Sequence, residues 1–146
     1  MTLPSLTDLV NKIIDVNDFS LSRDILEEYQ GDDWREYVKI NDERYNKEKV
    51  YVNDSFEILI LTWGVNQKAN IHNHAENGCF LKMLDGDLEE TLYDHQLKEI
   101  ETRHLSKNQI SYMNNNIGLH CVKNKSDKIA VSIHIYSPPN HLTKFY

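Results

Sequence analysis

The sequence predicts an all-β core, either a sandwich or a barrel, with small helices at its N-terminal end. From about Lys49 onward, short segments rich in β-branched and aromatic residues follow one another at roughly ten-residue spacing. Such spacing is typical of sandwiches and barrels. Helical periodicity is confined to the first third of the chain. With 146 residues, 40% of them hydrophobic, we expect a single domain, with residues 1–45 as a mostly helical cover and 46–146 as the barrel.

Each element has a local reason. Apolar residues recur at helical spacing over residues 6–14, and Ser5 stands where a helix N-cap belongs. A second short helix is expected around residues 21–26, and one or two further turns over 34–40. The expected strands are 50–52, 56–63, 79–84, 88–93, 99–105, 109–113, 119–123 and 129–136.

Composition narrows the classes of function. The net charge of −7 disfavours nucleic-acid binding, and no apolar run is long enough to span a bilayer. The N-terminus carries no basic-then-apolar signal pattern. Two cysteines do not make a disulfide framework, which favours a reducing cytoplasm. We therefore expect a cytoplasmic monomer or small homo-oligomer with no nucleic-acid or membrane partner.

Two histidines, His72 and His74, stand two residues apart. Side chains at i and i+2 of a strand share a face, so both imidazoles could reach one metal ion. Taken alone, the pair favours a simpler interpretation, two exposed loop histidines before a turn. The surroundings shift this balance, because Cys79 and Gly86 follow at fixed offsets and a second motif, G-x-H-x3-N, occupies residues 118–124.

Together these stretches resemble the two motifs of the cupin superfamily, whose members are jelly-roll-like β-barrels. In that superfamily the first motif supplies two histidines and a glutamate as metal ligands, and the second a further histidine. Cys79 stands at the glutamate position, so the resemblance implies a site of three neutral imidazoles: His72, His74 and His120. Imidazole suits iron, copper, nickel and zinc. Without a carboxylate a divalent ion keeps its full charge and should attract a thiolate.

The segment 130–139 alternates in polarity. Ser132, His134 and Tyr136 fall on one face of the expected strand, and apolar residues fall on the other. One interpretation is a half-exposed strand whose polar face meets solvent. The alternative is that the polar face points into a barrel, where the three side chains form a hydrogen-bonded relay beside the metal and Tyr136 could donate to bound oxygen or substrate.

Residues 71–94, 112–124 and 130–139, in this order and spacing, resemble the cysteine dioxygenase family of thiol dioxygenases. The resemblance implies an iron(II) cupin that adds both atoms of dioxygen to a thiol sulfur and yields a sulfinate, with the substrate chelating iron through thiolate and amine. It also implies the residue roles: iron ligands His72, His74 and His120; relay residues Ser132, His134 and Tyr136; and a thioether between Cys79 and Tyr136.

One departure from the family concerns substrate binding. Cysteine-specific members carry Tyr-x-Arg before the first long strand, and that arginine grips the substrate carboxylate. Here the aligned residues are Tyr45, Asn46 and Lys47, and lysine keeps the charge but loses the bidentate fork. Lys47 is therefore either a carboxylate clamp or a solvated charge. Arg44, at an odd offset, is expected on the opposite face.

Other residues receive structural interpretations. Cys121 is expected to face away from the metal as a buried thiol, and Trp34 and Trp63 to belong to the core or its cover. His95, His104 and His141 are expected to be exposed. The acidic pair Glu89-Glu90 is interpreted as part of a solvated strand face. The sequence does not indicate what closes the site after Pro139.

These observations predict an iron-dependent thiol dioxygenase acting on L-cysteine and dioxygen. Two alternatives stay open. The first is the same chemistry on another small thiol such as 3-mercaptopropionate, which the change to Lys47 allows. The second is a metal-binding cupin without redox chemistry, serving as a sensor or a small-molecule binding module; the relay argues against it, since simple binding needs no relay.

Overall fold

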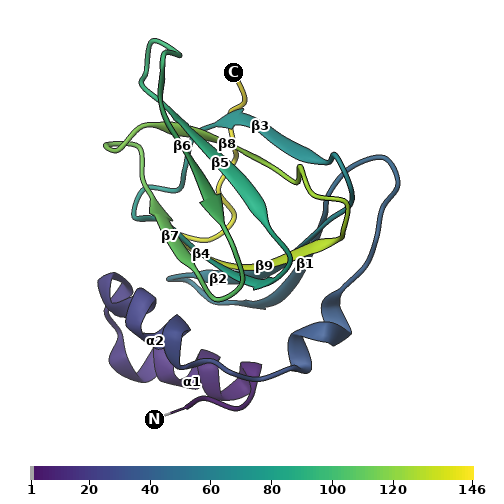
Figure 1. Cartoon of the computed structure of the whole chain (residues 1–146). Coiled ribbons are helices and arrows are strands. Elements are labelled where there is room, and N and C mark those ends of the chain that lie inside the picture. Colours follow the sequence, from purple (N-terminus) through teal and green to yellow (C-terminus); the bar gives the residue numbers. More distant parts are fainter. Residues whose placement is uncertain (1) are drawn as a thin grey trace.

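The computed structural model describes residues 2–146 and shows two antiparallel sheets that face each other, with the helices outside one of them (Figure 1). The predicted all-β core with small N-terminal helices is confirmed. The five-stranded sheet has the order β1 (Asn46–Val52), β2 (Glu57–Trp63), β9 (Ala130–Ser137), β4 (Gly78–Asp85), β7 (Ile110–Met113). The four-stranded sheet has the order β3 (Lys68–His72), β8 (Leu119–Lys123), β5 (Leu88–Tyr93), β6 (Glu99–Leu105).

The N-terminal third forms α1 (Leu6–Val16) and α2 (Ser22–Glu28), with 3₁₀ turns η1 (Phe19–Leu21) and η2 (Asp33–Tyr37). The Ser5 hydroxyl accepts a hydrogen bond from the Asp8 backbone N–H at 3.1 Å, as its N-cap position predicted. The turns expected over 34–40 are a single 3₁₀ segment that ends three residues earlier. These elements pack beneath β2, β4 and β9 in Figure 1.

The inner and outer faces of the five-stranded sheet bury different residues. On β9, Val131, Ile133 and Ile135 pack outward against the helices. The alternate residues of that strand point inward between the two sheets, where Ser132 and His134 are almost completely buried. Of the two interpretations of this strand, the structure therefore agrees with the one in which its polar face points into the barrel.

A buried lysine ties the helical cover to the sheet. Lys82 on β4 is 1% exposed, and its Nζ donates hydrogen bonds to the carbonyl oxygens of Leu26 and Tyr29, both at 2.7 Å. Those carbonyls lie at the end of α2, where a helix leaves its acceptors unpaired and where positive charge is favourable. The ammonium thus fixes the helices on the outer face and leaves the inner face to the cavity.

Strand β3 is not among the strands that the sequence predicts. Its residues, KANIH, include only one β-branched side chain, and they alternate between exposed and buried before the strand ends at His72. The strand pairs with β8, so that His72 lies directly opposite His120. Among the described residues, no helix is both long and apolar enough to cross a membrane.

Two residues of the second motif fix the ends of β8. Gly118 has a φ of 142°, and a Cβ there would collide with the Tyr93 carbonyl oxygen. Asn124 is fully buried, and its Nδ2 donates to the carbonyls of Trp63, Gly64 and Lys128. The glycine and the asparagine therefore hold the strand that carries His120 at a fixed register.

Candidate metal centre and substrate cavity

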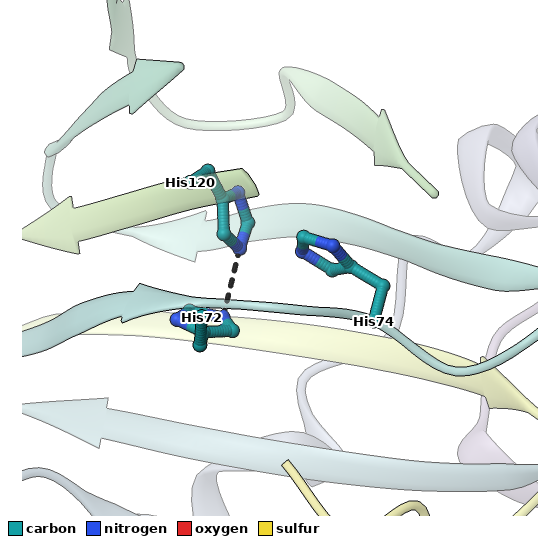
Figure 2. A group of neighbouring side chains, drawn as sticks. All are labelled: His72, His74 and His120. Atoms are coloured by element: carbon teal, nitrogen blue, oxygen red, sulfur yellow. Dashed lines mark hydrogen bonds between the residues drawn. The ribbon is translucent and has the colours of Figure 1, made fainter. Parts of the chain in front are cut away.

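The three predicted metal ligands come together. His72 ends β3, His74 lies in the connection to β4, and His120 lies on β8. One ligand atom from each ring lies within 4.8 Å of the others, and Figure 2 shows the rings pointing toward a common space. The expectation that His72 and His74 share a strand face is wrong in detail, because the strand ends between them.

His74 is held by a neighbouring loop in place of a strand. The Asn115 side chain accepts a hydrogen bond from the His74 backbone N–H at 2.8 Å and donates one to the His74 carbonyl at 3.0 Å. This pair of bonds replaces the ladder that a strand would have supplied, and it orients the residue as strictly.

Hydrogen bonds fix which nitrogen of two rings carries the proton. The His72 Nδ1 lies 2.6 Å from the Asn70 carbonyl, and the His120 Nδ1 lies 2.7 Å from a carboxylate oxygen of Glu90. Both acceptors lack a proton, so each Nδ1 must be the donor. In the neutral rings each Nε2 is then a bare lone pair, yet the two Nε2 atoms are 3.0 Å apart.

Two lone pairs at this distance repel unless a cation lies near both. Burial, followed by the charge of His120, lowers the pKa of His72 to about 3, so the His72 ring is neutral at neutral pH and its Nε2 can act as a ligand. Two nitrogens bound at right angles to one ion, at the usual metal–nitrogen distance, are about 3.0 Å apart. The spacing of His72 and His120 therefore fits a shared metal ion.

The third ring, that of His74, independently indicates that a binding partner is missing. Both ring nitrogens of His74 are buried, and neither has a hydrogen-bond partner among the described residues. Burial also lowers the pKa of this imidazole to about 2, which keeps it neutral and able to act as a ligand. An orphaned polar atom in a protein interior costs free energy, and a metal ion between the three rings would pair one of these two nitrogens.

Glu90 corrects the sequence analysis. It was interpreted as part of a solvated face, but it is fully buried on β5. Its carboxylate accepts hydrogen bonds from His120 Nδ1 at 2.7 Å and from the Ser111 hydroxyl at 2.8 Å, with Arg103 Nη1 at 3.9 Å. Burial raises the pKa of Glu90, but the bonds from His120 and Ser111 outweigh it and leave the pKa below its ordinary value.

The polar face of β9 forms one continuous chain of hydrogen bonds. The Trp63 indole N–H donates to the Ser132 hydroxyl at 2.9 Å, Ser132 lies 2.7 Å from His134 Nε2, and the Tyr136 hydroxyl lies 3.2 Å from His134 Nδ1. The buried donors of Trp63, Ser132 and His134 are all satisfied if the Ser132 O–H donates to Nε2 and the Nδ1–H donates to Tyr136. The Tyr136 O–H is then free to donate into the cavity.

Cys79 and Tyr136 are neighbours across two strands. They are directly paired in the register of β4 and β9, and the Cys79 Sγ lies 3.8 Å from His134 Nδ1. Burial raises the pKa of the Cys79 thiol, and burial likewise raises that of the Tyr136 phenol, so both groups are protonated at neutral pH. Both residues line the cavity that contains the three histidines.

The wall of this cavity also includes aromatic and charged side chains. Tyr45 stacks on Trp63 with ring centroids 4.6 Å apart, and Lys47 and Glu57 also line the wall. Lys47 stays exposed to solvent at the mouth, although partial burial of its ammonium lowers its pKa, a shift that Glu57 opposes. Arg44 borders the adjoining groove together with Lys47, contrary to expectation, because residues 42–44 form a bend and not an extended strand.

The segment after Pro139 closes one side of the cavity. His141, Thr143 and Phe145 line it, and the Phe145 ring lies 5.7 Å from that of His72. The segment pairs with the end of β3, since the Asn73 backbone N–H donates to the Lys144 carbonyl at 3.1 Å. His141 is half-buried, so the expectation that it is exposed is wrong, and Asn73 Oδ1 lies 3.0 Å from its Nε2.

Comparison with known proteins places this site in a family. The family model described as cysteine dioxygenase type I matches residues 2–146. The cysteine dioxygenase type 1 of Rattus norvegicus is 40% identical over 125 residues, which cover 79% of this chain. The protein of that name from Danio rerio is 34% identical over 94% of this chain and 75% of its own length.

The chain belongs to the cysteine dioxygenase type I family.

Solved structures agree on the fold. A double-stranded β-helix protein from Klebsiella pneumoniae superposes with a TM-score of 0.64 at 15% identity, over 75% of this chain and 90% of that one. A cupin superfamily protein from Desulfitobacterium hafniense gives 0.56 at 10% identity, over 68% and 83%. The predicted jelly-roll-like cupin barrel is thereby confirmed. The match to the rat cysteine dioxygenase spans 62% of that protein's length.

Within this cysteine dioxygenase family member, the remaining sequence expectations divide as follows. His95 and His104 are exposed, and Trp34 and Trp63 are buried, as expected. Cys121 does not line the cavity but is half-buried and not fully enclosed.

Three ionisable residues that line the cavity were not predicted as site residues: Glu57, Glu90 and His141. For the glutamates a sequence pattern existed, because each shares the inward-facing set of its strand with leucines that are buried.

Proposed function

We propose that this chain is an iron-dependent thiol dioxygenase that converts L-cysteine and dioxygen to cysteine sulfinic acid. The observation that carries the proposal is the convergence of His72, His74 and His120, with unpaired nitrogens, in a cavity that also contains the end of the Tyr136 relay. Iron(II), bound by the three imidazoles, would supply the redox chemistry that joins both oxygen atoms to the thiol sulfur.

The protein's own groups would orient the substrate. Lys47 at the mouth presents a cation to the substrate carboxylate, while Tyr45 stacked on Trp63 forms a rigid wall beside it. Tyr136 donates its hydroxyl hydrogen toward the reacting atoms, held by His134 and Ser132. Leu59, Leu81 and Met113 line the rest of the wall and exclude water from the reacting sulfur.

Cys79 and Tyr136 are also the pair that we propose to become joined by a thioether. Their register across β4 and β9 supports this. Forming the carbon–sulfur bond breaks the thiol S–H and one C–H of the phenol ring, and one dioxygen takes up the two electrons and two protons as hydrogen peroxide. The intact mass should therefore fall by that of two hydrogen atoms during turnover, and a Cys79 that alkylates completely in every preparation would contradict the proposal.

A second substrate stays open because of one observation. Lysine keeps the positive charge but not the bidentate fork of arginine, and such a point charge could hold the carboxylate of either thiol acid. Dioxygenation of 3-mercaptopropionate is therefore the alternative activity. Cytoplasmic location, a monomeric or small oligomeric state, and the absence of nucleic-acid or membrane partners stay predictions from the sequence.

The test measures metal and oxygen together. Purified protein loaded with iron(II) should consume one dioxygen for each sulfinate formed from cysteine or 3-mercaptopropionate. His120→Ala should lose most bound iron and all turnover, whereas His104→Ala, at an exposed histidine, should keep both. A protein that binds iron but consumes no dioxygen with any small thiol would support the non-redox binding module instead.

A further inference from the structure

Glu90 is a buried charge that the proposed chemistry does not yet use. It lies between Leu88 and Leu92 on the inward face of β5, and all three side chains are almost completely buried. A carboxylate in such surroundings costs several kcal/mol unless its oxygens are paired. The question is what the site gains from keeping it there.

The two carboxylate oxygens have different partners. Oε1 accepts the Ser111 hydroxyl at 2.8 Å and has the Arg103 guanidinium 3.9 Å away. Oε2 accepts a single bond, from His120 Nδ1 at 2.7 Å. Ser111 on β7 and Arg103 on β6 thus hold the carboxylate from one side, so that its other oxygen is directed at one ring of the histidine cluster.

We propose that Glu90 is a positioning residue for the metal, which fixes the His120 ring with Nε2 toward the other two imidazoles and supplies negative charge to an otherwise neutral ligand set. This inference rests on the metal centre of the proposed function. A carboxylate bonded to the far nitrogen of a ligating histidine fixes its tautomer and raises its basicity. No carboxylate lies in the ligand cluster itself among residues 2–146, so this one acts through the imidazole.

A purely structural role would also explain the hydrogen bonds of Glu90, because these bonds join β5 to β7 and β8. The two roles differ in what they predict for folding stability and for metal binding. A structural carboxylate changes folding stability and leaves metal affinity alone. A positioning carboxylate changes the affinity for metal and the electronic state of the bound ion, even where the fold is intact.

The experiment compares two isosteric substitutions in the full chain. Glu90→Gln keeps the size and an acceptor oxygen but removes the charge. Glu89→Gln is the matched control: it makes the same change one residue away, on a side chain that pairs with Lys125 at 2.8 Å and does not line the cavity. Anaerobic titration of iron(II) against a competing chelator gives the dissociation constants, and a redox titration gives the iron(III)/iron(II) potential.

We expect Glu90→Gln to weaken iron binding about 10- to 100-fold and to raise the potential, because loss of negative charge favours the lower oxidation state. Glu89→Gln should match the wild type in both. Ser111→Ala, which keeps the carboxylate but frees one oxygen, should weaken binding by a smaller factor, and it serves as the test if Glu90→Gln does not fold.

Wild-type affinity and potential in Glu90→Gln would overturn the inference and leave the proposed dioxygenase intact. Normal iron binding without thiol oxidation in the wild type would overturn the proposed function, while the comparison of the two variants would still decide the role of Glu90. A wild type that binds no metal would overturn both.

Discussion

The position of the proton on the His134 ring decides whether the Tyr136 hydroxyl can donate a hydrogen bond into the cavity. In the arrangement that pairs the buried Ser132 hydrogen, the Ser132 hydroxyl donates to His134 Nε2 and the His134 Nδ1–H donates to Tyr136. The phenol is left as an acceptor toward His134 and a donor toward the cavity.

Tyr136→Phe removes that donor and leaves the ring in place. We expect the variant to bind iron as the wild type does, since no metal ligand changes, and to lose turnover by roughly 10- to 100-fold. Inductively coupled plasma analysis and sulfinate formation measure the two quantities on one preparation. Wild-type turnover in the phenylalanine variant would show that the relay only supports the barrel.

Lys47 decides between two interpretations that the sequence left open. If its ammonium binds the substrate carboxylate, Lys47→Ala should lower kcat/KM for cysteine and 3-mercaptopropionate by roughly 10- to 150-fold, mostly through KM. Cysteamine, which lacks a carboxylate, should be little affected. Lys39→Ala, at an exposed lysine paired with Glu48, is the control. Unchanged KM values for both acids would make Lys47 a solvated charge.

Among the elements, a strand could be predicted where its own residues favour a strand and clear turn residues border it. The expected segments 88–93, 99–105 and 119–123 have the bounds of β5, β6 and β8, since turns with glycine, asparagine or aspartate separate them. Strand β3 was not predictable in this way, because its stability comes from pairing with β8 and not from its own residues.

The residues of the candidate site also divide into those that local sequence predicts and those that depend on distant parts of the chain. The histidines and the β9 residues could be found because their spacing is local in sequence. Glu90 and His141 could not, since their roles depend on which distant strand or segment lies opposite them. For Glu90 the alternation with Leu88 and Leu92 was visible, but two adjacent glutamates are far more often solvated than buried.

The contribution of Asn124 to the stability of the barrel can be tested by substitution. Its side chain joins the end of β2 to the turn before β9, and Asn124→Ala would leave one buried and two partly buried carbonyls without their donor. We expect a loss of about 3 kcal/mol in the free energy of unfolding, or roughly 10 °C in Tm. Asn116→Ala, at an exposed asparagine, should change Tm by less than about 2 °C. Equal Tm values for the two variants would contradict this role.

For the whole molecule, we expect that binding of a metal ion to the three histidines raises the free energy of unfolding. His72, His74 and His120 come from two strands and a connection, so a metal ion that binds only the folded chain stabilises all three together. Free metal at 100 times its dissociation constant should add about 2.7 kcal/mol to the free energy of unfolding. Tm measured with and without a chelator tests this, and equal values would argue against a site that spans these elements.

The metal-free protein should also be sensitive to acid. Burial lowers the pKa of His74 to about 2 and that of His134 well below its usual value. The unfolded chain takes up protons at these residues below about pH 6.5, whereas the folded chain does not, so stability present above that pH is lost as the pH falls. Each residue lowers the free energy of unfolding by up to about 1.4 kcal/mol per pH unit.

Urea unfolding of chelator-treated protein at pH 7.5, 6.5 and 5.5 measures this slope. A stability that stays constant down to pH 5.5 would mean that these imidazoles are protonated in the folded state as well.

The segment that closes the cavity also offers a place for a reporter. Leu142 is 91% exposed, yet its neighbours His141 and Thr143 both line the cavity wall. A fluorophore on Leu142→Cys, in a Cys121→Ser background that leaves only the buried Cys79, would stand one residue from two side chains of the cavity wall. Its emission would follow filling and emptying of the cavity in real time, so that substrate entry and product release could be timed separately from the chemistry between them.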